Sequence, residues 1–127
     1  MALTLGDDLV AFWRERHLCS VTSLRADGSP HVVPMGVVLD PDTQRAWAIT
    51  SGTSQKVANL RRGDARVAAC QVDGRRWSTL EGVAEVLDDA ESVQEAERRY
   101  AARYRQPREN PARVALRISL TRVLGNV

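Results

Sequence analysis

Cysteine is scarce in this chain, with two residues in 127, Cys19 and Cys70. They lie far apart in the sequence and have neither the spacing nor the nearby histidines of a zinc site. A fold held by disulfides is therefore not indicated, and we expect two buried free thiols and no metal. Lysine is scarcer still, because 17 of the 18 basic residues are arginine and the remaining one is Lys56.

Long apolar runs are also absent, and none approaches the roughly 20 residues of a membrane-spanning helix. The first residues show no basic region followed by an apolar one, so no signal peptide is expected. The formal net charge of +2 is too small to indicate nucleic-acid binding. We therefore expect a cytoplasmic protein that binds neither membrane nor nucleic acid.

The common hydrolase and metalloenzyme motifs are missing as well. The sequence contains no Gly-x-Ser-x-Gly, no His-Glu-x-x-His and no Cys-x-x-Cys. The acidic pairs Asp7–Asp8 and Asp88–Asp89 precede helical patterns, where carboxylates cap helices and complement the helix dipole. We interpret them as helix caps and not as a general acid and base.

What is present is the pattern of a single α+β domain over residues 1–127. Apolar spacing predicts helices over residues 7–16, from Thr53–Ser54 to Gly63, and from Asp88–Asp89 to about Arg105. The last of these mixes acidic and basic residues, so we expect a solvated face. Strands are expected over residues 19–24, 31–39, 45–51, 65–72, 77–87 and 114–124.

Turn signals indicate that these strands are mostly antiparallel. Asp27–Gly28 and Asp73–Gly74 are strong hairpin signals, residues 40–44 form a further turn, and residues 107–111 separate the last helix from the last strand. Six strands in a chain of this size favour a small antiparallel barrel over an open sheet.

The most informative segment for chemistry runs from Ile49 to Asn59. A strand there ends in Thr50 and Ser51, and a helix begins after Thr53 and Ser54. Lys56 lies one turn into that helix, with Asn59 at i+3 on nearly the same face. Hydroxyls, free N–H groups and an ammonium suit a phosphate or carboxylate. The spacing is not that of a P-loop, and an ordinary surface helix with a solvated lysine remains the alternative.

Two further segments are candidate sites. In residues 31–36, Pro34 and Gly36 favour an edge, a bulge or the close approach of a flat ligand to the backbone. His31 there is as readily a surface residue, and Met35 a core residue. Residues 75–77, Arg75, Arg76 and Trp77, suit an acidic or aromatic group, or a solvated turn beside a packed indole.

Taken together, these segments resemble the pyridoxamine-phosphate-oxidase-like superfamily of flavin and deazaflavin oxidoreductases, which are split β-barrels. The stretches that carry the resemblance are the N-terminal helix and residues 24–33, 49–59, 81–86 and 99–104. Residues 54–56, 71–74, 76–77 and 80–82 are similar to the branch of F420-dependent biliverdin reductases. The resemblance implies a six-stranded split barrel that forms a homodimer, with coenzyme F420 at the subunit interface.

The resemblance also implies a set of cofactor-binding residues. It places the acidic tail of the cofactor on the Ile49–Asn59 segment, the ring along the second strand, and a third group beside the ring, from the same or the partner subunit. The residues are Thr50, Ser51, Ser54, Gln55, Lys56 and Asn59 for the tail; His31, Val32, Val33, Pro34 and Met35 for the ring; and Gln71, Val72 and Trp77 beside it.

The activity implied is hydride transfer from reduced F420 to a conjugated acceptor, with biliverdin as the first candidate. Arg75 or Arg76 is expected to hold substrate carboxylates or to position a proton donor. The alternatives are an FMN-dependent oxidase or reductase, a protein that only binds a cofactor or tetrapyrrole, and a dimer without ligand. Vitamin B6 chemistry is not expected, because the second strand lacks the basic residues of the pyridoxamine phosphate oxidases and no C-terminal extension follows Val127.

Overall fold

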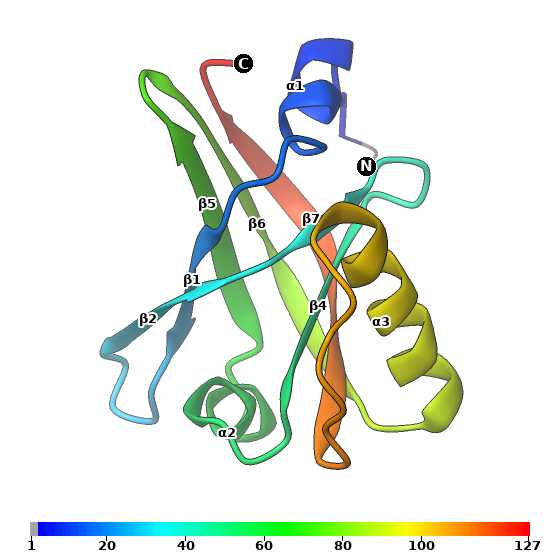
Figure 1. The fold of residues 1–127 in the computed structure, drawn as a ribbon. Helices are drawn as coiled ribbons and strands as arrows, with labels where there is room; N and C mark the ends of the chain where they lie inside the picture. The colour runs from blue at the N-terminus through cyan, green and yellow to red at the C-terminus, as the bar shows by residue number, and fades with distance from the viewer. Residues whose placement is uncertain (1–2) are drawn as a thin grey trace.

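The computed structural model describes residues 3–127, and it shows a single curled sheet with three helices around it (Figure 1). The elements in chain order are α1 (Asp7–Phe12), β1 (Cys19–Leu24), β2 (Pro30–Met35), β3 (Val38–Asp40), β4 (Arg45–Ser51), α2 (Gln55–Arg61), β5 (Arg66–Asp73), β6 (Arg76–Leu87), α3 (Ala90–Arg103) and β7 (Arg113–Gly125).

The strand order explains the shape of the sheet. All neighbouring strands are antiparallel, and the order is β2-β1-β5-β6-β7-β4-β3. β2 and β3 are consecutive in the chain but form the two opposite edges of the sheet, and only Gly36 and Val37 connect them. Since two residues span so short a distance, the sheet has to curl until its edges meet. The edges do not pair with each other, and this leaves a split in the barrel.

The structure has seven strands where the sequence predicted six, because the expected strand over residues 31–39 is interrupted at Gly36. A Cβ atom on Gly36 would lie 2.8 Å from Tyr104 Cε2 and 2.9 Å from Tyr100 Cε2, so α3 reaches the backbone there. The neighbouring backbone of Val37 is bonded to side chains of α3: its N–H donates to Tyr104 Oη at 3.2 Å, and its carbonyl accepts from Arg103. These groups are therefore not available to extend a strand.

α1 covers one end of the barrel, and α2 lies at the opposite end (Figure 1). The predicted helix over residues 7–16 is shorter than expected, since the backbone tightens into i→i−3 bonds after Phe12. Gly6 is the N-cap, so the expected capping by Asp7 or Asp8 is wrong, although both carboxylates lie in the first turn. Phe12 and Trp13 enter the core, where Trp13 Nε1 donates to Ser78 Oγ at 2.9 Å.

The other helix ends and the hairpins follow the predicted signals. Asp89 caps α3 and accepts from the Ser92 N–H at 3.0 Å, and Gly63 follows α2 with a φ of +122°. Gly28 and Gly74 have φ of +85° and +63° in the two predicted hairpin turns. Among residues 3–127, no helix is both long enough and apolar enough to cross a bilayer.

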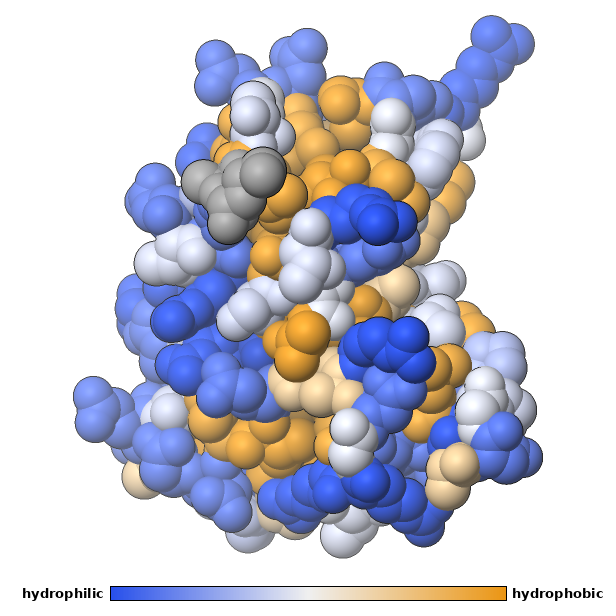
Figure 2. All heavy atoms as spheres, turned by 180° about the vertical axis from the view of Figure 1, so that it is seen from behind, coloured by the Kyte–Doolittle hydropathy of each residue, from blue (hydrophilic) through white to orange (hydrophobic). Residues whose placement is uncertain are grey.

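The outward side of the sheet carries exposed apolar side chains. The register places Val32 opposite Thr22 and Val72 opposite Trp77, and these residues face away from the core. We call this surface the outer face, and its exposed apolar residues are Val32, Val72, Trp77, Val83 and Leu124. Seen from behind, the molecule shows apolar patches separated by hydrophilic side chains (Figure 2).

Candidate functional site

A cavity of about 390 Å³ lies where the ends of β2 and β4 approach the loop between α3 and β7. We call it the seam cavity. It is lined by Leu18, Pro34, Met35, Gly36, Ile49, Thr50, Ser51, Lys56, Tyr100, Arg105, Pro107, Arg108, Asn110 and Arg113. The segments around it are connected, since the Gly52 N–H donates to the Ala112 carbonyl at 2.7 Å.

The predicted anion-binding segment contributes four residues to this cavity, Ile49, Thr50, Ser51 and Lys56. Lys56 is half-buried, and no carboxylate within residues 3–127 lies within ion-pair distance of its ammonium group. Burial accordingly lowers the pKa of Lys56. An unpaired, half-buried ammonium beside two hydroxyls gains most from an anionic ligand.

The neighbouring polar residues of this segment point elsewhere. Asn59 was expected on nearly the same face as Lys56, but its side chain is buried and donates to Ser23 Oγ at 2.9 Å. Gln55 donates to Asn59 Oδ1 at 2.7 Å, and Ser54 Oγ accepts from Thr50 Oγ1 at 3.4 Å. The expectation for Asn59 is therefore wrong in geometry, because the polar face of this seven-residue helix divides between the cavity and β1.

The second strand contributes only its end to the cavity. Pro34, Met35 and Gly36 line it, whereas His31, Val32 and Val33 do not. Val32 belongs to the outer face, Val33 packs against the core, and His31 Nδ1 is buried without a hydrogen-bond partner among the described residues. The alternation of side chains along a strand separates these neighbours onto two faces.

The third predicted group lies away from the cavity within this chain. Gln71 is fully buried, donates to the Phe12 carbonyl at 2.9 Å and accepts from Arg103. Val72 and Trp77 are paired on the outer face.

The predicted free thiols are both free, but only Cys19 is buried, while Cys70 is half-buried. Burial raises the pKa of Cys19 to about 11, so its thiol is protonated at neutral pH.

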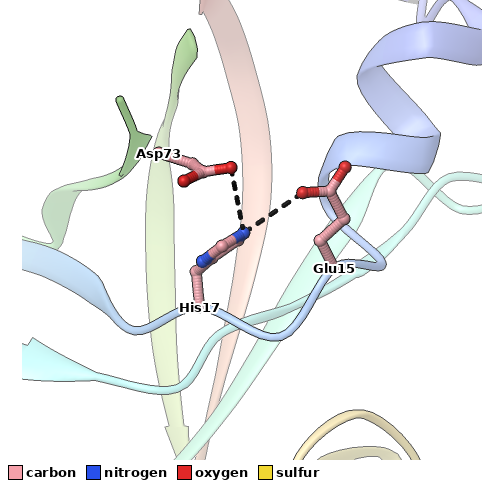
Figure 3. Close-up of side chains that lie close together, drawn as sticks. All are labelled: Glu15, His17 and Asp73. Carbon is pink, nitrogen blue, oxygen red and sulfur yellow. Dashed lines mark hydrogen bonds and ion pairs between the residues drawn. The ribbon is translucent and has the colours of Figure 1, made fainter. Parts of the chain in front are cut away.

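Arg76 takes part in an ion-pair cluster with Glu15, His17 and Asp73, of which Figure 3 shows the last three. His17 Nε2 lies 3.2 Å from Glu15 Oε1 and 3.8 Å from Asp73 Oδ2. Arg76 Nη2 donates to the same two oxygens, at 2.8 Å for Glu15 Oε1. A metal ion there would face the guanidinium at close range, so the cluster is best described as a set of ion pairs.

Neither Arg75 nor Arg76 lines the seam cavity within this chain. Sequence reasoning instead missed seven of the lining residues. They are Leu18, Tyr100, Arg105, Pro107, Arg108, Asn110 and Arg113. Of these arginines, Arg113 is neutralised by Glu97 at 2.7 Å, whereas Arg105 and Arg108 have no carboxylate within ion-pair distance in the described chain.

Comparison with known proteins shows the family of this chain. Residues 5–126 match the model of the pyridoxamine 5'-phosphate oxidase family. The chain belongs to this family. It is 52% identical over 122 residues to an F420H2-dependent biliverdin reductase of Mycobacterium tuberculosis, an alignment that covers 96% of this chain and 88% of that protein.

Solved structures share the fold. A conserved hypothetical protein from Mycobacterium tuberculosis superposes with a TM-score of 0.81 at 25% identity and covers 97% of this chain and 84% of its own. An F420 reductase superposes with a TM-score of 0.73 at 20% identity, over 90% of this chain and 94% of its own. The predicted antiparallel split barrel is therefore confirmed, with seven strands in place of six.

Proposed function

We propose that this protein is an F420-dependent oxidoreductase that reduces a conjugated acceptor, with biliverdin as the first candidate. The observation that carries the proposal is the seam cavity, in which Lys56 lies unpaired beside Thr50 and Ser51. The 52% identity to an F420H2-dependent biliverdin reductase identifies the ligand and acceptor to be tested first.

The residues of the cavity fit an acidic cofactor tail. Lys56 supplies a positive charge whose burial is not offset by a carboxylate in the described chain, and Thr50 and Ser51 supply hydroxyl donors. Arg108 extends the positive charge along the α3–β7 loop. A ligand with several negative charges is favoured over a neutral one, because only the former compensates these groups.

The residues at the other side of the cavity fit a flat ring. The end of β2 lines this side with Pro34, Met35 and the following Gly36, of which only Met35 has a large side chain. Tyr100 adds an aromatic side chain. The coenzyme, when bound, supplies the hydride. The chain itself binds the tail through Lys56, orients the ring against β2 and limits the access of water from the side of Tyr100.

We also propose that two copies assemble through the outer face. Pro34 lies at the seam cavity and, because it is two residues from Val32 along the strand, on the same side of β2 as Val32. A second copy on this face would border the cavity, and its Val72 and Trp77 would be available to the ligand. In this arrangement the exposed apolar side chains would be buried against the second copy, and Val72 and Trp77 would lie beside the cofactor ring, as the resemblance implies.

We also propose a cytoplasmic location, as expected from the sequence.

Replacement of Lys56 tests the proposal. We expect the purified protein to bind oxidised F420 more tightly than FMN when cofactor fluorescence is followed, and Lys56→Ala to raise the Kd for F420 about 10- to 100-fold, since a charge-assisted hydrogen bond contributes roughly 1.5–3 kcal/mol. Arg62→Ala is the matched control, because Arg62 is an exposed cation at the other end of α2.

The other outcomes have clear meanings. A preference for FMN would place the protein among the flavin-dependent members of the family. Tight F420 binding without oxidation of reduced F420 by any acceptor would make it a cofactor-binding protein. An unchanged Kd for F420 in Lys56→Ala would mean that the acidic tail of the cofactor does not bind in this cavity.

A further inference from the structure

A second cavity of about 310 Å³ adjoins the seam cavity. We call it the side cavity. The two share Leu18, Tyr100 and Arg105, and the side cavity is further lined by Arg16, His17 and Tyr104. The two cavities are therefore neighbours of comparable size, with these three side chains at their boundary.

The side cavity carries two guanidinium groups with no carboxylate partner. Neither Arg16 nor Arg105 forms an ion pair within residues 3–127, and both are exposed. His17 differs, because its ring is already bonded to Glu15. The pKa of Glu15 is lowered to about 2 by Arg76 and His17, so this carboxylate stays ionised and committed to that pair. Arg16 and Arg105 remain available to an acidic ligand.

The rest of the lining is aromatic and apolar. The rings of Tyr100 and Tyr104 are stacked with centroids 5.0 Å apart. Leu18 lies at the boundary between the two cavities, and its side chain is 63% exposed. Leucine side chains in folded proteins are more often buried. A planar apolar body beside two guanidinium groups is the complement of a conjugated molecule that carries a carboxylate.

We propose that Arg16 and Arg105 form a carboxylate-binding subsite for the acceptor that is reduced in the seam cavity. The proposal rests on the proposed function. It assigns to Arg16 and Arg105 the role that the sequence suggested for Arg75 and Arg76, since Arg76 is bonded to Glu15 and Asp73. The acceptor class is a planar conjugated carboxylic acid, and the conjugated body lies against Leu18 and Tyr100.

The test compares biliverdin with its dimethyl ester, which has the same conjugated system without the negative charges. We expect Arg16→Gln and Arg105→Gln each to raise the KM for biliverdin about tenfold, the lower end for a hydrogen bond to a charged group, with kcat changed less than twofold. The KM for the ester should not change in either variant. Arg105→Lys should retain part of the affinity, and Arg62→Gln, an exposed cation on α2, is the control.

Direct titrations separate this proposal from the proposed function. The Kd for F420 should stay within twofold in Arg16→Gln, because Arg16 does not line the seam cavity, while the Kd for biliverdin, followed by absorbance without cofactor, should rise about tenfold in both variants. A weaker binding of F420 with unchanged biliverdin binding would assign the subsite to the cofactor tail and overturn the proposal. Equal losses for biliverdin and its ester would also overturn it, because charge would not be what is recognised.

Failure of the proposed function has a different signature. In that case the wild-type protein would not bind F420 at all, whatever the behaviour of Arg16 and Arg105. A wild-type protein that reduces biliverdin, with variants that leave both its KM and its Kd unchanged, would overturn the subsite alone.

Discussion

Arg103 connects three segments that are far apart in the sequence. Its guanidinium donates to the Glu15 carbonyl at 2.6 Å, to the Val37 carbonyl and to Gln71 Oε1. The same group lies 5.5 Å from the centroid of the Trp13 ring. The sequence predicted that α3 has a solvated face, and Arg103 is an exception. The Glu15 and Val37 carbonyls that it binds lie in loops, and the pattern of residues within α3 does not predict that these loops lie beside it.

Loss of this side chain is expected to destabilise the fold. Arg103→Ala leaves the buried Gln71 Oε1 and two carbonyls without this donor, at a cost of about 2–4 kcal/mol in the free energy of unfolding, measured by urea titration. Arg98→Ala is the control. Arg98 is exposed and pairs with Glu95 within α3, so its loss should cost less than about 0.5 kcal/mol. Equal costs for the two variants would contradict this role of Arg103.

At the same scale, the sequence located the site residues that are neighbours along the chain. Thr50, Ser51 and Lys56 could be predicted because a strand end followed by a helix start brings them together by local geometry. Arg105 could not be predicted, because no local sequence signal indicates that the loop after α3 returns to the ends of β2 and β4. Asn59 was placed wrongly since the side to which a short helix turns depends on its packing partner, here Ser23.

Among the elements, the loop after α1 and the β5–β6 hairpin are joined by the Glu15–Arg76 pair. The guanidinium of Arg76 and the ring of His17 lower the pKa of Glu15 to about 2. The folded state therefore holds this carboxylate ionised at a pH where the unfolded chain, with a pKa near the ordinary value of 4.5, binds a proton. The stabilisation from this pair is full above about pH 4.5 and is lost as the pH falls towards 2.

Glu15→Gln should show this dependence. At pH 7 we expect the variant to unfold at a lower urea concentration than the wild type, and the difference between the two midpoints should shrink as the pH is lowered from 5 to 2. Asp64 has the same direction of shift because of Arg66, and it is present in both proteins, so the difference isolates Glu15. Glu109→Gln, on an exposed loop residue, should not alter the midpoint. A midpoint difference that does not vary with pH would exclude the ion pair as its source.

The elements themselves were predicted where turn chemistry is local. Gly28 and Gly74 adopt a positive φ in the two hairpin turns, and the Asp-Gly sequence at each turn predicts this conformation. The division of the strand over residues 31–39 was missed, because it depends on Tyr100 and Tyr104 in a helix that begins more than fifty residues later. Local signals therefore gave the order of elements, whereas the break that creates the cavity is a product of tertiary contact.

At the scale of the whole molecule, the outer face predicts assembly. If two copies meet through it, a charge placed at its centre should separate them, because an unpaired carboxylate in an apolar contact is not solvated. We expect Val72→Asp to shift the protein from dimer to monomer in size-exclusion chromatography with light scattering. Gln94→Glu adds a charge on the exposed surface of α3 and should leave the mass unchanged. A monomeric wild-type protein would contradict the proposed assembly.

The strand order has a consequence for how the chain is made. β7 is synthesised after the other six strands, yet it is the strand that pairs with both β6 and β4. Before it emerges from the ribosome, the nascent chain holds two groups of strands that do not pair with each other, β2-β1-β5-β6 and β4-β3, and the second group is too small to be stable alone. Folding therefore waits for translation to pass residue 125, and until then the apolar inner surfaces of both groups are exposed to whatever chaperones meet the nascent chain.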